Sequence, residues 1–142
     1  MELVPYHTLD YTRPHLIELE GSQDIIIANL TFINSPFWTI HPVYCSNVRI
    51  QNLTILAPLN SPNTDGIDPD SSSDVCIEDC YISVGDDVIS IKSGWDEYGV
   101  SYRRPSSNII ICRVIGQTHT SSGLALSSEM SGGIKGVHAQ DL

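Results

Sequence analysis

The chain repeats one short apolar pattern four times, and this repeat restricts the folds that it can adopt. Each copy begins with Asn or Asp and carries apolar residues at its second, fourth and seventh places. Successive copies start 23, 27 and 34 residues apart, and they occupy residues 24–30, 47–53, 74–80 and 108–114. A period in the twenties is typical of a solenoid, in which each unit buries its apolar face only against its neighbours.

A second apolar segment recurs inside each unit, at residues 39–42, 66–69, 88–91 and 123–126. Its β-branched residues, and the Gly, Pro, Asn and Ser around it, favour short strands that end in turns. No stretch has a helical period, and the longest interval holds an insertion, residues 95–105, that is rich in charge and tyrosine. We therefore predict an all-β fold, a right-handed parallel β-helix of about five rungs.

Two other folds share part of this pattern. A leucine-rich repeat has a period of similar size, but its Leu-x-x-Leu-x-Leu signature is absent. A β-sandwich agrees with the strand content, although it does not explain why the four copies share one register.

Length and charge set further limits. The 142 residues form one domain, residues 1–142, with a formal net charge of −10 and a pI near 4.6. Nucleic acid is disfavoured as a partner because its phosphates need a basic face, and no apolar run is long enough to span a membrane. Met1-Glu2-Leu3 lacks the basic and apolar regions of a signal peptide, and residues 137–142 look like the opening of another rung. We expect a monomeric, partial β-helix that is truncated at both ends.

The four cysteines do not form paired Cys-x-x-Cys units, which argues against a zinc site made from them. Cys80 stands at the repeat place that Leu or Val holds in the other copies, so we expect a small buried apolar residue there. No specific disulfide pairing is predicted. Two glycosylation sequons begin at Asn29 and Asn52, at the same repeat place. They are either acceptors for glycosylation or a stacked pair of asparagines at a turn.

Two short aspartate clusters carry the chemistry. Asp65 and Asp87 fall in one column of the repeat, since each stands two residues before an aligned isoleucine. Parallel strands lie about 4.8 Å apart, which makes the two side chains neighbours with Asp86 beside them. Clustered carboxylates repel one another, so the pKa of at least one should rise, and that residue could serve as an acid. An acid opposite ionised carboxylates is what cleavage of a glycosidic bond requires.

Other interpretations of the same aspartates remain open. Asp is common at turns because its side chain satisfies local backbone groups. The same carboxylates could also form a calcium site, as a pectate lyase would need. Strict strand alternation directs Asp65 inward, together with Ile67. The aspartates reach the outer face only if the chain bends just before Gly66 and Val88, and Gly66 makes the first of these bends easy.

A set of ordered motifs carries a family resemblance: Asn63-Thr64-Asp65-Gly66-Ile67-Asp68-Pro69-Asp70-Ser71, Gly85-Asp86-Asp87, Ile91-Lys92-Ser93-Gly94 and Ser128-Glu129-Met130-Ser131-Gly132-Gly133, with Thr12-Arg13-Pro14 and Asn34-Ser35-Pro36-Phe37-Trp38 in support. These motifs resemble family 28 of the glycoside hydrolases, the polygalacturonases, and most of all its plant and bacterial branch with exo-acting members. It implies a right-handed parallel β-helix that hydrolyses α-1,4-galacturonosyl bonds in pectin, with inversion and without a cofactor or metal. It also implies a protein secreted to the cell wall.

The resemblance assigns roles to individual residues. Asp86 would be the general acid, while Asp65 and Asp87 would hold and deprotonate the attacking water. An inverting acid and base are usually about 6.5–9.5 Å apart, which also favours Asp86 as the acid over the two column neighbours. Asn63 would support the site by hydrogen bonding, and Lys92 and His119 are the candidates for substrate binding. For His119, a solvated loop residue is the alternative.

Two departures from the family pattern stand beside the intact aspartates. Ser122 occupies the place where many members carry a histidine, and the downstream basic element that grips a substrate carboxylate would lie beyond Leu142. These departures favour a rival interpretation, a non-catalytic β-helix fragment that binds wall polysaccharide. A calcium-dependent lyase is a second rival.

Overall fold

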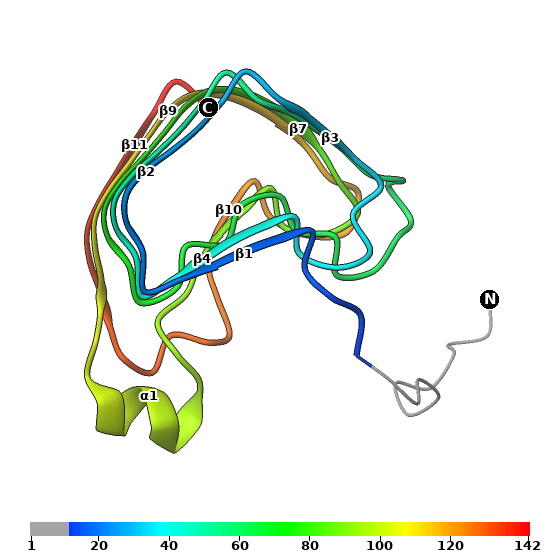
Figure 1. The fold of residues 1–142 in the computed structure, drawn as a ribbon. Helices are drawn as coiled ribbons and strands as arrows, with labels where there is room; N and C mark the ends of the chain where they lie inside the picture. The colour runs from blue at the N-terminus through cyan, green and yellow to red at the C-terminus, as the bar shows by residue number, and fades with distance from the viewer. Residues whose placement is uncertain (1–11) are drawn as a thin grey trace.

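The chain winds into a coil of parallel β-strands, and the computed structural model describes residues 12–142. Residues 1–11, which include the start Met1-Glu2-Leu3 discussed above, lie outside the described part. Figure 1 looks along the coil, so that successive turns lie over one another. The strands are β1 (Ile17–Glu20), β2 (Gln23–Ala28), β3 (Thr31–Ile33), β4 (Ile40–Val43), β5 (Ser46–Gln51), β6 (Thr54–Leu56), β7 (Ser73–Ser83), β8 (Ile89–Ile91), β9 (Ser106–Gln117), β10 (Leu124–Leu126) and β11 (Ile134–Gln140).

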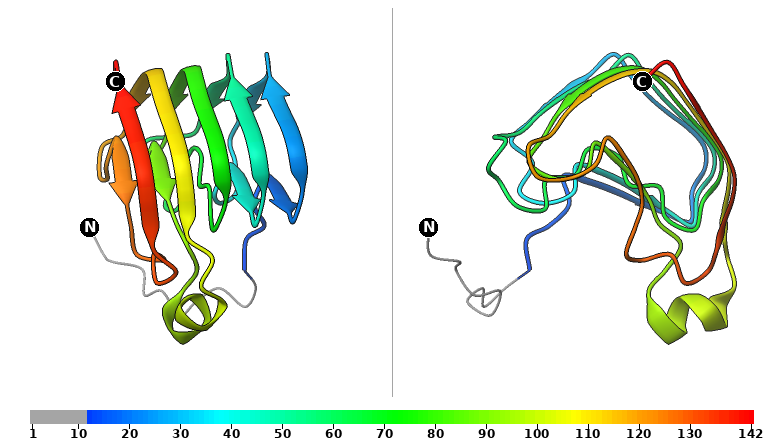
Figure 2. Two further views of the ribbon diagram at one scale, coloured as in Figure 1. Left: turned by 90° about the vertical axis from the view of Figure 1, so that its left-hand side faces the viewer. Right: turned by 180° about the vertical axis from the view of Figure 1, so that it is seen from behind.

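Strand pairing confirms the predicted repeat. The main sheet has the order β11-β9-β7-β5-β2, which is one strand from each of five turns, and every pair in it is parallel (Figure 2, left). A second face of the coil joins β1 to β4 and β8 to β10. Ile67 links these two pairs through isolated bridges to Ile40 and Ile89. The fold is therefore the right-handed parallel β-helix that the sequence predicted.

Stacked branched side chains fill the coil. The fourth place of the repeat forms a buried column in which Ile50 and Ile77 pair in register and Ile77 pairs with Ile111. Full burial of such a side chain contributes about 1.5–3 kcal/mol. The seventh place is buried in three of the four copies, including Cys80, whereas Leu30 on the first described turn is 49% exposed. All four cysteines are free, and Cys80 packs in register as the predicted small apolar residue.

Asn and Asp begin the repeats because the backbone there enters the left-handed region. The φ angles are 57° at Asp24, 52° at Asn47, 56° at Asp74 and 54° at Asn108, a region that these two residue types tolerate best after glycine. The side chains also pair between turns, with Nδ2 of Asn47 donating to Oδ1 of Asp24 at 2.6 Å. Nδ2 of Asn52 likewise donates to Oδ1 of Asn29 at 2.6 Å, so the sequon asparagines form the stacked pair.

The insertion at residues 95–105 contains a helix, α1 (Asp96–Tyr102), which corrects the expectation that no segment is helical. Seven residues make only two turns, so the sequence could not display a helical period. Arg103 ends the helix with φ 55°, and its N–H donates to the carbonyl of Gly99. Figure 1 shows α1 projecting away from the coil. Within residues 12–142, the helix content includes nothing with the length and apolar character needed to cross a membrane.

Candidate active site

The chain bends at Gly66 and at Val88, directly after Asp65 and Asp87. The N–H of Gly66 donates to the carbonyl of Asp87 at 2.9 Å, and Ile67 bridges Ile89 on the next turn. Asp65 and Asp87 are therefore stacked in one column, as the repeat predicted. The second bend follows Gly85, where a Cβ would lie 2.0 Å from a backbone carbonyl oxygen, so only glycine fits there.

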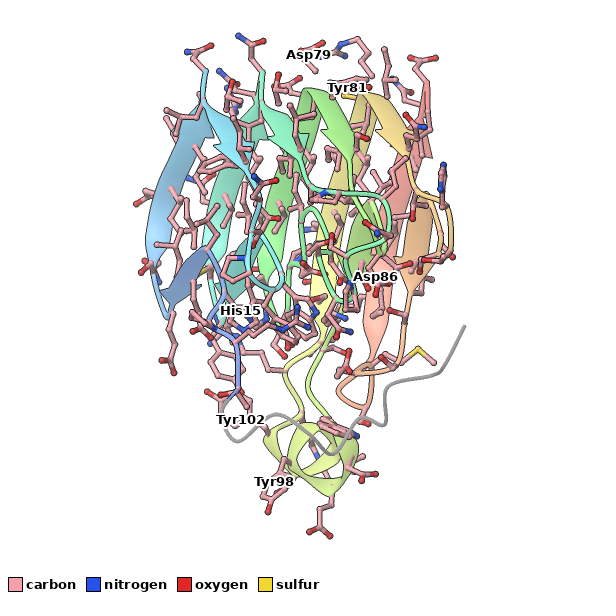
Figure 3. The ribbon with its side chains drawn as sticks, turned by 90° about the vertical axis from the view of Figure 1, so that its right-hand side faces the viewer. His15, Asp79, Tyr81, Asp86, Tyr98 and Tyr102 are labelled. Atoms are coloured by element: carbon pink, nitrogen blue, oxygen red, sulfur yellow. The ribbon has the colours of Figure 1, made fainter. Side chains whose placement is uncertain are left out.

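Asp65, Asp86 and Asp87 form one carboxylate cluster, called here the aspartate trio. One oxygen from each lies within 4.8 Å of the others. Asp65 and Asp87 are buried, at 4% and 7% exposure, whereas Asp86 is half-buried (labelled in Figure 3). The closest oxygens are thus nearer together than the roughly 6.5–9.5 Å usual between an inverting acid and base.

The three carboxyl groups of the trio are not equally supported by hydrogen-bond donors. The N–H groups of Asn63 and Asp87 donate to the two oxygens of Asp86 at 3.1 and 3.0 Å. Asp87 accepts from the hydroxyl of Ser121 and from the N–H of Ser122 at 2.9 Å. Among the described residues, Oδ1 of Asp65 is buried without any hydrogen-bond partner. Donors favour the ionised form of a carboxyl group, so Asp65 is the least supported of the three.

Asp65 has a raised pKa. Burial, and next the charge of Asp86, raise the pKa of Asp65 to about 7, although Lys92 opposes the rise. The prediction that at least one carboxyl group has a raised pKa is confirmed, and the residue is Asp65. The raised pKa lets Asp65 hold a proton at a pH where an ordinary carboxyl group is ionised.

Asn63 contacts the trio through its backbone, and its side chain serves another partner. Its Oδ1 accepts a hydrogen bond from Arg13 at 3.1 Å, and the same guanidinium also donates to the carbonyl of Pro62. The sequence marked Arg13 only as part of a resemblance and missed it as a neighbour of the site. The signal was the motif Thr12-Arg13-Pro14, whose distance from the aspartates along the chain hides the contact.

Lys92 is not a free surface cation. It is 2% exposed, and its Nζ donates to Oε2 of Glu129 at 2.8 Å while lying 4.2 Å from the ring centroid of Trp38. Burial acts to lower the pKa of Lys92, but Asp68 and Glu129 raise it overall, so the ammonium stays charged. In this arrangement the positive charge of Lys92 acts on the carboxyl groups of Asp65 and Asp68.

Asp68 is a second residue that sequence reasoning missed. It is fully buried, and neither of its oxygens has a hydrogen-bond partner among the described residues. Burial, and next the neighbouring Asp65, hold its pKa well above the ordinary value. The alternation of side chains along Ile67-Asp68-Pro69 could have indicated that Asp68 belongs to the site, because Asp68 then lies on the face opposite the inward Ile67.

His119 and Ser122 lie on the turn after the trio. His119 is exposed and, within residues 12–142, makes no hydrogen bond or ion pair with the aspartates. Its neighbour Thr120 donates to the carbonyl of Gly85 at 3.0 Å. The carbonyl of Ser122 accepts from the N–H of Val88, which places Ser122 next in the column above Asp87.

Comparisons with known proteins agree with this geometry. The family described as Glycosyl hydrolases family 28 matches residues 7–137. A protein of Vitis vinifera named Probable polygalacturonase is 57% identical over 94% of this chain, and an Endo-polygalacturonase of Pectobacterium carotovorum subsp. carotovorum is 32% identical over 94%. The chain covers 27% and 31% of the length of these two relatives.

Solved structures give the same result. A hyperthermoactive exopolygalacturonase from Thermotoga maritima has a TM-score of 0.88 and 37% identity, with 96% of this chain and 30% of that one covered. A polygalacturonase from Erwinia carotovora ssp. carotovora has a TM-score of 0.75 and 29% identity, with 90% and 32% covered. The β-helix and the family match over most of the chain establish that it belongs to family 28 of the glycosyl hydrolases.

Proposed function

We propose that this chain carries the acid–base centre of a polygalacturonase, which hydrolyses α-1,4-galacturonosyl bonds in pectic polysaccharide. The observation that carries the proposal is the aspartate trio, three carboxyl groups with oxygens within 4.8 Å of one another, one of them with a pKa raised to about 7. Such a cluster offers both a proton donor and ionised acceptors at one place. The similarity to polygalacturonases of a plant and a bacterium supports the same reaction.

Asp86 is the general acid in this proposal, and Asp65 and Asp87 hold and deprotonate the water. Asp86 is the most exposed of the three and is fixed by two backbone N–H groups, so it can meet the oxygen of a leaving sugar. In the free protein, however, the raised pKa belongs to Asp65. The proposal therefore requires that the coupled group hold its proton on Asp86, and not on Asp65, when a sugar chain covers the site.

Neighbouring residues complete the proposed site. The backbone of Asn63 positions Asp86, while the buried ammonium of Lys92 stabilises the negative charge of the trio. His119 is the proposed contact for a sugar on the exposed side. Since pectin is a component of plant cell walls, we expect the whole protein to act outside the cell, as a monomer on this polymer.

Release of reducing ends from polygalacturonate tests the proposal. We expect hydrolysis that persists with a calcium chelator and yields no absorbance from unsaturated product, because the trio needs no metal for acid–base chemistry. Asp86→Asn should lose at least about 100-fold in rate, which is the lower range for removal of a general acid. The matched control is Asp24→Asn, at an exposed place in β2 far from the trio along the chain.

The outcomes separate the alternatives. Unsaturated product would show a lyase and refute hydrolysis. Binding of polygalacturonate without any release, unchanged in Asp86→Asn, would show a non-catalytic binding fragment. Proton NMR of the newly formed anomeric centre tests inversion, since the carboxyl groups of the trio are closer than those of most inverting pairs.

A further inference from the structure

Two histidines and a glutamate meet on the first two turns, apart from the aspartate trio. His15 lies just before β1, Glu18 lies in β1 and His41 lies in β4, where Glu18 and His41 are register partners. Register partners in parallel strands point to the same side. One donor atom from each of the three residues lies within 4.8 Å of the others. Figure 3 shows His15 displaced from Asp86 along the stack, toward the N-terminal turns.

His41 is buried without a hydrogen bond. It is 6% exposed, and neither ring nitrogen has a hydrogen-bond partner among residues 12–142. Its Nδ1 lies 3.6 Å from Oε1 of Glu18 and its Nε2 lies 3.8 Å from Oδ2 of Asp70, both beyond hydrogen-bond distance. Nδ1 of His15 is buried and unpartnered as well. Buried polar atoms nearly always have partners, so imidazoles that face each other and a carboxylate point to a shared ligand.

We propose that His15, Glu18 and His41 bind one divalent cation of the zinc class. Two imidazoles and a carboxylate form a known type of zinc site, whereas calcium and magnesium prefer oxygen ligands alone. Zinc bonds of about 2.0–2.1 Å in a tetrahedron place the donor atoms about 3.3 Å apart. The 3.6 Å between His41 and Glu18 is close to this spacing. The side chain of Glu18 is 56% exposed and is free to turn toward the ion.

The surroundings suit a metal ligand. A histidine that binds a metal usually faces a carboxylate with its second nitrogen, and Asp70 stands there for His41. Asp70 is itself held by the N–H of Gly94, which donates to its Oδ1 at 2.8 Å. The rings of Trp38 and His41 pack in a T-shaped arrangement with 4.9 Å between their centroids, and Trp38 gives the site an apolar wall.

The nearby positive charges are engaged elsewhere. Lys92 lies over Trp38 but is paired with Glu129, and Arg13 donates to Asn63 and Pro62. A bound ion would fasten the segment before β1 to β4 and would leave one coordination position open to water.

Calorimetric titration of the 142-residue chain with zinc chloride tests the proposal. We expect one ion per chain. Zinc should bind at least roughly 10–100-fold more weakly to His15→Gln, Glu18→Gln and His41→Gln, because the loss of a residue that only hydrogen-bonds to a metal ligand already weakens binding by that factor. His138→Gln, an exposed histidine of β11, is the matched control and should bind as the wild type does. Circular dichroism checks the fold of each variant, and Glu18→Gln, at an exposed position, still tests the site if a histidine variant unfolds.

Cobalt binding supplies an independent measurement. Imidazole and carboxylate ligands give weak visible bands, whereas a thiolate adds an intense charge-transfer band. A thiolate band, binding that is lost in Asp86→Asn but kept in His41→Gln, or a preference for calcium would overturn the proposal. Absence of zinc binding at millimolar concentration would also overturn it, and His41 would then be a buried imidazole between two carboxylates.

Discussion

Replacement of Asp65 by Asn removes a carboxyl group whose ionisation the folded chain opposes. Burial and the charge of Asp86 raise its pKa from the ordinary 3.8 to about 7. This rise of about three pKa units corresponds to about 4 kcal/mol, at 1.36 kcal/mol per unit. Between about pH 4 and pH 7 the folded chain keeps a proton that the unfolded chain releases, so the free energy of unfolding falls as the pH rises.

The amide of Asn escapes this penalty, and the two proteins should diverge with pH. We expect equal stability near pH 3, where Asp65 is mostly protonated in both states, and an advantage for Asp65→Asn of up to about 4 kcal/mol near pH 8. Urea unfolding at several pH values measures the difference. Asp24→Asn, at an exposed place in β2 where the amide oxygen can still accept from Asn47, controls for the general effect of one fewer carboxylate. A difference that stays constant with pH, or a less stable variant at pH 8, would refute the reasoning.

Three further substitutions test the fold and the buried charges, each by urea unfolding. Gly85→Ala should cost more than about 1–3 kcal/mol, because its Cβ meets a backbone carbonyl at 2.0 Å, while Gly123→Ala, with open space around it, should change little. Ile77→Ala should cost about 2–5 kcal/mol at its fully buried place, against at most about 0.5 kcal/mol for the exposed Ile26→Ala. Lys92→Met should cost about 3 kcal/mol by leaving a carboxylate unpaired, and an unchanged midpoint would show that the ion pair contributes nothing.

The fold could be predicted because its information is local and repeated. Each turn has the same polar start and the same buried places, so the register of four copies fixes the stacking of all their strands. The column that contains Asp65 and Asp87 followed from the same register. The helix α1 could not be predicted, since an insertion of its length appears once and obeys no repeat.

Burial and charge at the site depend on contacts that the repeat does not encode. The sequence did not reveal that Lys92 is paired, because its partner Glu129 lies 37 residues away, on a loop outside the regular pattern. The pKa of Asp65 is raised because the side chain is buried beside the charge of Asp86, and no donor among the described residues reaches its Oδ1. Such differences among three adjacent carboxyl groups arise from the tertiary structure, and no spacing in the sequence expresses them.

The stacking of successive turns explains both the regular packing of the coil and the unfavourable contact between carboxyl groups at its site. A parallel stack brings like places of successive turns together, which suits apolar columns and polar columns that alternate donor with acceptor. The column of Asn and Asp residues that begin the repeats follows this rule, since Asn47 donates to Asp24 and Asn108 donates to Asp74. The column of Asp65 and Asp87 breaks it, because a carboxylate stacked on a carboxylate has no donor to offer. Asp65→Asn would place an amide donor beside a carboxylate acceptor in this column, as in the column that begins the repeats. The gain in free energy of unfolding of this variant therefore measures the stability that the wild-type chain loses by holding an acid–base site.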